Sequence, residues 1–520
     1  MIRKLIIAAT FLCLGTQQIH AQAKLSIDKV YSAYLRNSGT IMENNQIKGY
    51  FFLYQSDKID RNTNEYTLQI LDQNLNKVKD IKFQDSKQIS LLEAAYNGSS
   101  LAFLFKNAET KMLEMKVYDI DGKLKFTYTR EYDRKTDDLM KQYETLHTDE
   151  GTNQNVFDLG EQGYASVLPL RDGKQRTYEV DFYSSQSKKQ WTYVPNDDEE
   201  KYAQAEFLGS TDSLIILEVM KRKRALSGKM AASLIGLNFV TKKKEFEIDA
   251  EGSDYKFVPT SVVKLSGTGK ILVMGSYFDL NANIAKDASL GLGLYEIDSK
   301  GKVLSKTYNS WGGDLAKYLP TNAKGKIDDV GFLYIHKLLK APNGKLFVVG
   351  EGYKRKASAL GIGLAVLSGG RSTGSTGVTK IVITDMVMME FNDKYKVTNA
   401  TIYDKTQNDA TLSAISDYNS QHAIAMMLKM VGAFDYEFTT GEPDNSSFTI
   451  CYSDYVRSSE YKGQTFNAIR YNGSKFTTDK IELKSKASNM RVFPAKAGSV
   501  MILEYFKKDK RLDLRLEKLG

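Results

Sequence analysis

Short segments of alternating apolar and polar residues run along almost the whole chain. Seven segments share one pattern, in which an apolar strand, a cluster of Asp, Asn, Gly or Lys, and a second alternating strand follow one another. Alternation with a central turn cluster predicts a β-hairpin. The seven segments are residues 66–83, 113–132, 178–194, 233–249, 292–308, 387–404 and 466–483.

A further β-type segment precedes most of these hairpins, so the repeated unit has three or four antiparallel strands. These segments are residues 49–56, 100–107, 164–171, 213–220, 270–278 and 345–353. Units of this kind predict an all-β fold, namely a β-propeller-like ring of seven or eight blades with short helical insertions. The spacing of the units is uneven, which leaves two β-sandwich or barrel domains as the alternative.

The two ends of the chain predict how the ring closes. Residues 499–520 form one more pair of strands and stop before a complete unit, whereas residues 24–35 contain a strand without a unit of its own. We therefore expect the N-terminal strand to complete the last blade. A short helix is predicted over 137–147, with Thr136 as its cap, and a second helical piece over 313–319.

The first 23 residues predict an export signal. Arg3 and Lys4 precede an apolar run that is too short for a membrane span, and small residues follow at Ala21 and Ala23. Residues 24–520 then form the repeat domain, with a long Gly/Ser-rich insertion near 354–380. No transmembrane anchor is expected, and the exported chain is predicted to be periplasmic or secreted.

The insertion contains a sequence that resembles a phosphate-binding loop. Gly369 and Gly374 have the right spacing, but Ser375 stands where such a loop has Lys, and the residues that follow are typical of a strand. The similar stretch 265–270 is predicted to be a turn. We therefore expect no nucleotide and no other cofactor.

Metal and nucleophile chemistry have few candidates. His147, His336 and His422 lie far apart in the sequence, and the acidic stretch 119–122 is better explained as a β-turn than as a calcium loop. Cys451 is the only cysteine after the signal, which excludes an intrachain disulfide, and it is predicted to be a core residue. The sequence assigns no metal ligand, and the catalytic residues remain unknown.

The charge is mildly basic, since 72 Lys and Arg against 63 Asp and Glu give a formal net charge of +9. The densest basic stretches, 221–229 and 242–244, are predicted to be solvated hairpin ends, with contact to acidic cell-surface material as the alternative. No nucleic-acid-binding module is present, so no nucleic-acid partner is expected. Two Trp are few for carbohydrate platforms; 31 Tyr can take that role, although alternating Tyr in strands is more typical of packing.

Residues 29–83, together with the stretches 344–359 and 380–393, resemble a family of functionally uncharacterised exported proteins of Gram-negative bacteria. The resemblance implies export across the inner membrane and a β-rich repeat fold. It implies no active-site residue.

These observations favour a binding or interaction module at the cell envelope, a monomer whose partner is an envelope protein or a glycan. The sequence leans against catalysis without deciding the question. The alternative is a propeller-type glycan hydrolase or lyase that uses carboxylates brought together at the axis from different blades. A third possibility, a structural part of an envelope complex, would show an exposed apolar patch. Residues 359–367 are a candidate for such a patch, although a helix packed over the propeller face is the favoured interpretation of this segment.

Overall fold

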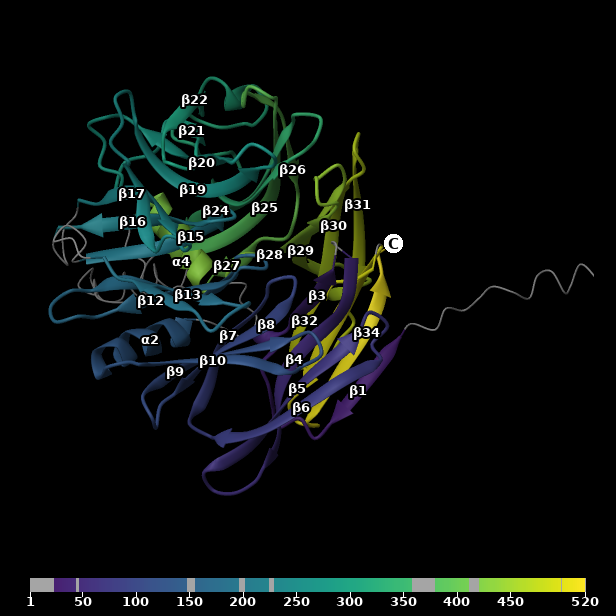
Figure 1. Cartoon of the computed structure of the whole chain (residues 1–520). Coiled ribbons are helices and arrows are strands. Elements are labelled where there is room, and N and C mark those ends of the chain that lie inside the picture. The colour runs from purple at the N-terminus through teal and green to yellow at the C-terminus, as the bar shows by residue number, and fades with distance from the viewer. Residues whose placement is uncertain are drawn as a thin grey trace, which may run out of the picture.

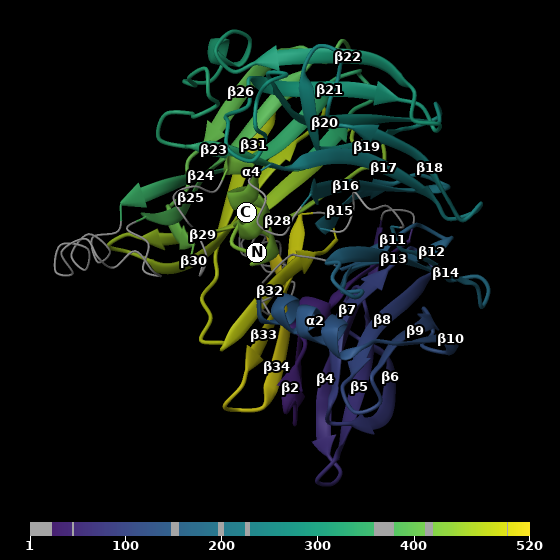
Figure 2. The same ribbon diagram turned by 90° about the vertical axis from the view of Figure 1, so that its left-hand side faces the viewer.

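The computed structural model describes residues 23–43, 46–146, 155–195, 202–223, 229–357, 379–410, 420–496 and 498–519. In this part of the chain, eight antiparallel sheets of four or five strands form a ring (Figure 1). The predicted β-propeller is confirmed, with eight blades, and two separate sandwich or barrel domains are excluded. Figure 2 shows blades 1 to 3 in purple and blue below blades 4 to 6 in teal and green.

The blades are numbered here in chain order. Blade 1 contains β2 (Ser32–Ala33), β3 (Gly39–Glu43), β4 (Gln46–Lys58), β5 (Thr63–Asp72) and β6 (Lys77–Ser86), and blade 2 contains β7 (Ile89–Tyr96), β8 (Ser100–Asn107), β9 (Met112–Asp119) and β10 (Leu124–Glu131). Blade 3 contains β11 (Val156–Asp158), β12 (Gly163–Leu170), β13 (Thr177–Ser184) and β14 (Gln190–Tyr193), and blade 4 contains β15 (Tyr202–Ser210), β16 (Leu214–Arg222), β17 (Ala231–Asn238) and β18 (Lys243–Asp249).

The second half of the ring repeats this plan. Blade 5 contains β19 (Lys256–Leu265), β20 (Lys270–Phe278), β21 (Gly291–Ile297) and β22 (Val303–Ser310), and blade 6 contains β23 (Phe332–Lys340), β24 (Leu346–Ala357), β25 (Thr379–Phe391), β26 (Val397–Tyr403) and β27 (Asn408–Ala410). Blade 7 contains β28 (Tyr436–Gly441), β29 (Phe448–Arg457), β30 (Lys462–Tyr471) and β31 (Phe476–Glu482), and blade 8 contains β32 (Asn489–Pro494), β33 (Ser499–Phe506), β34 (Arg511–Lys518) and β1 (Lys24–Asp28).

The seven predicted hairpins are the third and fourth strands of blades 1 to 7, and the predicted preceding segments are second strands. The hairpin between β9 and β10 shows why the turn residues predict them. The carboxylate of Asp119 accepts a hydrogen bond from the backbone N–H of Lys123 at 2.7 Å, and Gly122 has a left-handed φ of 77°. A glycine adopts this conformation without the steric cost that a Cβ atom brings.

The ring closes as the sequence predicts. Strand β1 pairs with β34 in antiparallel register, with Leu25 opposite Leu514, and the backbone N–H of Val30 donates to the carbonyl of Lys510 at 2.8 Å. One apolar cluster combines residues of blades 8 and 1, including Tyr50 and Leu514. Blade 8 is therefore built from both ends of the chain, and the ladder joins them.

The hydrophobic core lies between blades rather than at one centre. Successive clusters pair blades 3 and 4, blades 4 and 5, and blades 5 and 6. First strands of neighbouring blades contact one another, as β7 with β11, β15 with β19, and β28 with β32. These contacts are the ones expected of strands that line the axis.

Two helices and two short 3-10 turns interrupt the strands in the described part of the chain. Helix α2 (Arg134–Leu146) confirms the predicted helix, but the predicted cap is wrong: the carboxylate of Asp133, three residues before Thr136, accepts the hydrogen bond from the backbone N–H of Thr136 at 2.7 Å. The second predicted piece is only the 3-10 turn η3 (Leu315–Lys317), and η1 (Leu35–Asn37) was not predicted. No helix in the described ranges is long and apolar enough to cross a membrane.

Several predictions lie wholly or mostly outside the described residues. These are the predicted export signal apart from Ala23, residues 224–228 of the basic stretch 221–229, the glycine-rich loop 369–376 and the apolar segment 359–367. These remain predictions from the sequence.

Candidate functional site

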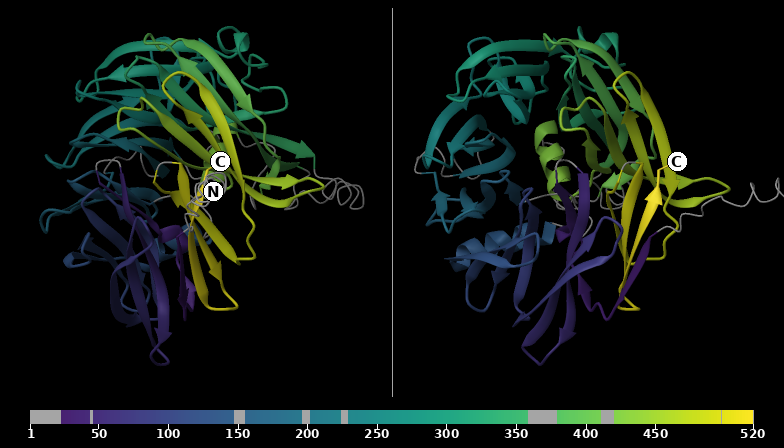
Figure 3. Two further views of the ribbon diagram at one scale, coloured as in Figure 1. Left: turned by 90° about the vertical axis from the view of Figure 1, so that its right-hand side faces the viewer. Right: turned by 45° about the vertical axis from the view of Figure 1, so that its right-hand side comes forward.

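Helix α4 (Gln421–Met430) lies inside the ring of blades (Figure 3). It belongs to the connection between blades 6 and 7, yet its side chains reach blade 4. The ammonium of Lys429 forms an ion pair with Glu206 on β15, and His422 contacts Glu218 on β16 at 3.2 Å. The helix therefore spans the axis, and the cavities of the molecule adjoin it.

The local sequence explains why a helix forms here. The hydroxyl of Ser420 accepts a hydrogen bond from the backbone N–H of Ala423 at 3.1 Å, which caps the N-terminus. Ile424 and Leu428 share one face and pack on blade 6. At the C-terminus, Gly432 has a φ of 63°, and the N–H groups of residues 432 and 433 return to carbonyls of residues 429 and 428, which is a Schellman motif.

A polar cavity of about 830 Å³ lies beside the C-terminal end of α4. Blades 6, 7 and 8 contribute its walls, and polar groups make up most of the lining. Both signs of charge are present. The charged lining residues are Asp409, Asp435, Glu437, Lys462, Lys484 and Arg491.

Five of the first strands contain a β-bulge, which changes the direction of one side chain in each. In each case one residue drops out of the antiparallel register, and a bulge turns its side chain away from the regular alternation. The bulged residues are Leu92, Leu208, Thr260, His336 and Glu437. In blades 6 and 7 the bulged residue is ionisable: His336 contacts Glu351, and Glu437 lines the polar cavity.

Glu351 organises the charges behind this cavity. Its side chain has no exposed surface and receives four donors. Lys405 Nζ and the N–H of Asp435 lie 3.1 Å from Oε1, while His336 Nε2 at 3.0 Å and the N–H of Tyr436 at 3.1 Å face Oε2. Burial raises the pKa of Glu351, but Lys405 and His336 outweigh burial and hold the pKa below its usual value. Glu351 is thus a buried anion that fixes the start of β28.

Two neighbouring carboxyl groups show the opposite shift. Burial raises the pKa of Asp435 to about 6, although Lys405 pairs with it and opposes the change. Burial also raises the pKa of Glu437, whose carboxylate accepts a hydrogen bond from the hydroxyl of Ser453 at 2.7 Å. Lys405 pairs with two carboxylates, and Glu351 has the larger number of donors, so the pKa is lowered at Glu351 and raised at Asp435.

Two tyrosines give the polar cavity an aromatic edge. Tyr455 is 45% exposed, and the guanidinium of Arg457 lies 5.4 Å from its ring centre. The hydroxyl of Tyr461 donates to the carbonyl of Gln464 at 2.7 Å, and Lys484 Nζ lies 5.9 Å from the Tyr461 ring centre. Exposed aromatic faces beside charged and amide groups are typical of sites for ligands with alternating apolar and hydroxyl surfaces.

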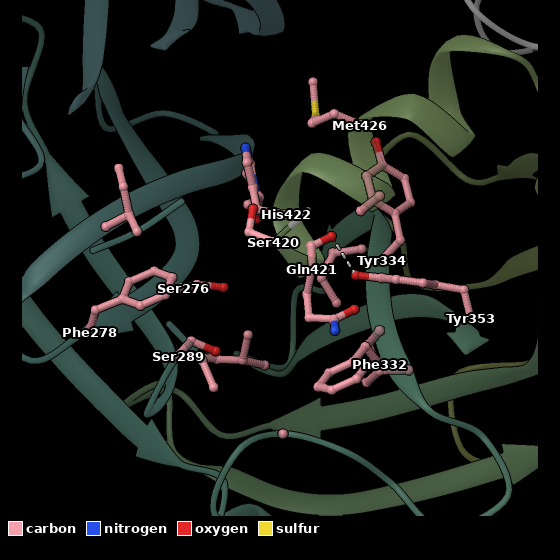
Figure 4. A pocket seen from close by; sticks show the side chains of 18 of the residues that line it. Ser276, Phe278, Ser289, Phe332, Tyr334, Tyr353, Ser420, Gln421, His422 and Met426 are labelled. Atoms are coloured by element: carbon pink, nitrogen blue, oxygen red, sulfur yellow. Dashed lines mark hydrogen bonds between the residues drawn. The ribbon is translucent and has the colours of Figure 1, made fainter. Parts of the chain in front are cut away.

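A second, smaller pocket of about 90 Å³ lies on the other side of α4, among blades 4, 5 and 6 (Figure 4). Its walls include the rings of Phe278, Phe332, Tyr334 and Tyr353. The hydroxyl of Tyr353 donates to the backbone carbonyl of Gln421 at 2.8 Å, which joins α4 to β24. Glu218 and His422 also line this pocket, which is called the axial pocket below.

The cysteine and the histidines considered in the sequence as candidate site residues lie in different parts of the structure. Cys451 is buried in the core between blades 7 and 8, and burial raises the pKa of its thiol, as expected of a core residue. His422 lines the axial pocket, His336 contacts the buried Glu351, and His147 lies outside the described residues. Within the described ranges, no three His, Cys, Asp or Glu side chains come together as metal ligands.

Sequence reasoning did not find Glu351, Asp435 or Glu437. The hydrogen bond from Asp435 to Glu351 joins residues 84 positions apart, and no local motif marks either of them. The catalytic alternative proposed from sequence requires carboxylates from different blades close together at the axis; Glu351 of blade 6 and Asp435, next to the first strand of blade 7, both pair with Lys405.

The family model for DUF6770, described as a family of unknown function, matches residues 1–520. The chain belongs to this family. This agrees with the resemblance to an uncharacterised family, whereas the family description states neither an export signal nor a bacterial source. No curated protein matches the chain.

Solved structures similar to the chain include propellers of distant sequence. The prolyl oligopeptidase B of Galerina marginata is 8% identical with a TM-score of 0.40, over 92% of this chain and 56% of that one. The WD40 domain of SCAP from fission yeast is 7% identical with a TM-score of 0.36, over 95% and 92%. The β-propeller domain of the Trilobed protease from Pyrococcus furiosus is 12% identical with a TM-score of 0.32, over 74% and 97%.

Proposed function

We propose that this DUF6770 protein is a glycan-binding module whose ligand enters the polar cavity between blades 6, 7 and 8. The observation that carries the proposal is a cavity of about 830 Å³ that combines polar walls with the exposed ring of Tyr455. A sugar ring presents an apolar face to an aromatic ring, while its hydroxyls need donors and acceptors around it. Asp409, Gln464 and Arg491 supply such groups.

We also propose that the protein acts outside the cytoplasm, at the cell envelope. The support is the sequence at the N-terminus, where Arg3 and Lys4 precede the apolar run to Leu14. N-terminal sequencing of the chain isolated from the periplasm or the medium tests this part. A start at residue 22 or 24 supports export, and an intact Met1 in the cytoplasm contradicts it.

A panel of tetrasaccharides tests the binding function. Chitotetraose, cellotetraose, maltotetraose and tetragalacturonate are titrated into the purified protein by calorimetry. The variant Tyr455→Ala is expected to weaken the binding of a responding sugar by about tenfold, which corresponds to a lost stacking contact of roughly 1.4 kcal/mol. Tyr318→Ala is the matched control, because Tyr318 is 40% exposed and does not line the cavity.

The outcome of that panel is decisive for the polar cavity. An equal loss of sugar affinity in both variants, or an unchanged affinity in Tyr455→Ala, would show that the sugar binds elsewhere. The absence of any response across neutral and acidic sugars would count against the glycan ligand itself.

A second candidate function is glycan hydrolysis or elimination, favoured by the raised pKa values of Asp435 and Glu437. A carboxyl group with a raised pKa holds its proton to a higher pH than an ordinary one and can then protonate a leaving oxygen, while a nearby carboxylate can act as the base. Incubation of the same sugars with wild-type protein and with Glu437→Gln tests this function. New reducing ends that form with wild-type protein but not with Glu437→Gln would support catalysis. Sugars that bind to the wild-type protein and stay intact would support a function in binding alone.

A further inference from the structure

The axial pocket is separate from the proposed glycan site, and its chemistry differs. Its walls are more apolar than polar and include five aromatic side chains, with about 90 Å³ of free space, and Ser276 and Gln421 add polar groups (Figure 4). The ring of Tyr334 stacks on Phe434 with centres 4.7 Å apart, so packing fixes its orientation.

Glu218 places a buried carboxylate in this lining. Its side chain is 1% exposed, on the second strand of blade 4. The Oε1 atom lies 3.2 Å from His422 Nε2, but the contact lacks the directional geometry of a hydrogen bond, and neither atom has another hydrogen-bond partner. A buried carboxylate oxygen without a donor is costly, and it marks a place where a ligand donor is favourable.

We propose that the axial pocket binds a primary alkylammonium group, with its ammonium at Glu218 and its alkyl stem between the aromatic rings. An ammonium supplies three donors and a positive charge to a carboxylate that lacks a hydrogen-bond donor. The faces of Phe332, Tyr334 and Tyr353 suit both the stem and the charge, since cations are attracted to aromatic faces. A free diamine and the side chain of a peptide lysine share this chemistry.

The other charges around the pocket set the pH dependence of binding. Lys429 of α4 is paired with Glu206 of β15, and the connecting loops of blade 5 contribute Asp287 and Lys324. Burial lowers the pKa of His422, but Glu218 outweighs burial and raises it. The imidazolium competes with an incoming ammonium for Glu218, and burial lowers the pKa of Lys429 to about 8, so that loss of either positive charge as the pH rises tightens binding.

The two tryptophans of the chain give a direct readout. Trp311 lines the pocket, and its Nε1–H donates to the hydroxyl of Ser289 at 3.0 Å, whereas Trp191 lies in β14 of blade 3. In protein labelled with ¹⁵N-tryptophan, n-butylamine is expected to shift the indole signal of Trp311 in a saturable way and to leave that of Trp191 in place. The neutral isostere n-butanol should bind at least about tenfold more weakly.

The variant Glu218→Gln tests the contact between the ammonium and Glu218, and it should weaken the binding of n-butylamine by at least about tenfold. Glu504→Gln, a buried glutamate paired with Arg515 in blade 8, is the matched control and should bind as wild type. Putrescine and Nα-acetyl-lysine amide then distinguish a free diamine from a peptide lysine. If Glu218→Gln does not fold, the comparison of n-butylamine with n-butanol in the wild-type protein still decides the proposal.

Three results would overturn the proposal. They are equal binding of n-butanol and n-butylamine, a Trp311 signal that does not respond to the amine, and an affinity that falls rather than rises between pH 6 and pH 8.5. None of these outcomes bears on the glycan site, which is tested with sugars and with Tyr455.

Discussion

Lys405 and Glu351 form an ion pair with 3.1 Å between the charged atoms, and neither side chain is exposed to solvent. Both oxygens of Glu351 face donors only, from Lys405, His336 and the backbone of residues 435 and 436. The pair therefore connects blade 6 to the first strand of blade 7, behind the polar cavity.

Replacing Glu351 by Gln should destabilise the fold strongly. The amide removes the negative charge that compensates Lys405. Its NH₂ group also faces hydrogen-bond donors, whichever of the two carboxylate oxygens it replaces. We expect a loss of about 3 kcal/mol in the free energy of unfolding, measured by denaturant titration, as for other broken buried pairs. The control Asp212→Asn breaks an exposed pair with Lys264 and should cost less than about 1 kcal/mol. Equal effects of the two variants would contradict the role of Glu351.

Closure of the ring by β1 predicts a second stability effect. Deleting residues 24–28 uncovers the edge of β34 and removes the side chains of Leu25 and Ile27 from the cluster shared by blades 8 and 1. The thermal unfolding midpoint should fall, because an exposed strand edge and apolar surface replace a paired ladder. Ser26→Ala, which removes only an exposed hydrogen bond to Asp513, should leave the midpoint nearly unchanged. An unchanged midpoint in the deletion would show that β1 does not close the ring.

The raised pKa of Asp435 predicts how stability depends on pH. The folded protein takes up this proton near pH 6, whereas the unfolded chain does so only near 3.8, the ordinary pKa of an aspartate. The group therefore adds stability as the pH falls from about 6 to about 4. The free energy of unfolding of wild type minus that of Asp435→Asn should rise on acidification over this range. A difference that falls instead would indicate an Asp435 held as a carboxylate by Lys405.

The second and third strands of the blades were predictable because they are either buried on both faces, which gives a continuous apolar run, or alternate strictly between apolar and polar residues. All eight residues of Ser100–Asn107 are buried, and the apolar run 101–105 makes that strand visible in the sequence. First strands such as Tyr202–Ser210 are mostly half-exposed along the axis and contain a bulge, so their alternation is broken. The sequence consequently predicted the hairpins and the closure, but it left the blade number between seven and eight.

Helix α4 and the buried charges were missed for different reasons. Ser420 and Gly432 are recognisable helix caps, and a search for them would have found α4. The contact between Lys405 and Asp435 joins residues 30 positions apart, and only the ring brings both to Glu351. Such a cluster has no local signature, because each member belongs to a different strand or connection.

The affinity of the variant Ala487→Trp for the tightest-binding tetrasaccharide tests the central claim most directly. Ala487 lines the polar cavity from the connection between blades 7 and 8, outside any strand, so an indole there fills the space without disturbing a ladder. Binding should weaken at least about tenfold by calorimetry while the thermal unfolding midpoint stays within a few degrees of wild type. Wild-type affinity in a variant that remains folded would show that the glycan does not occupy this cavity.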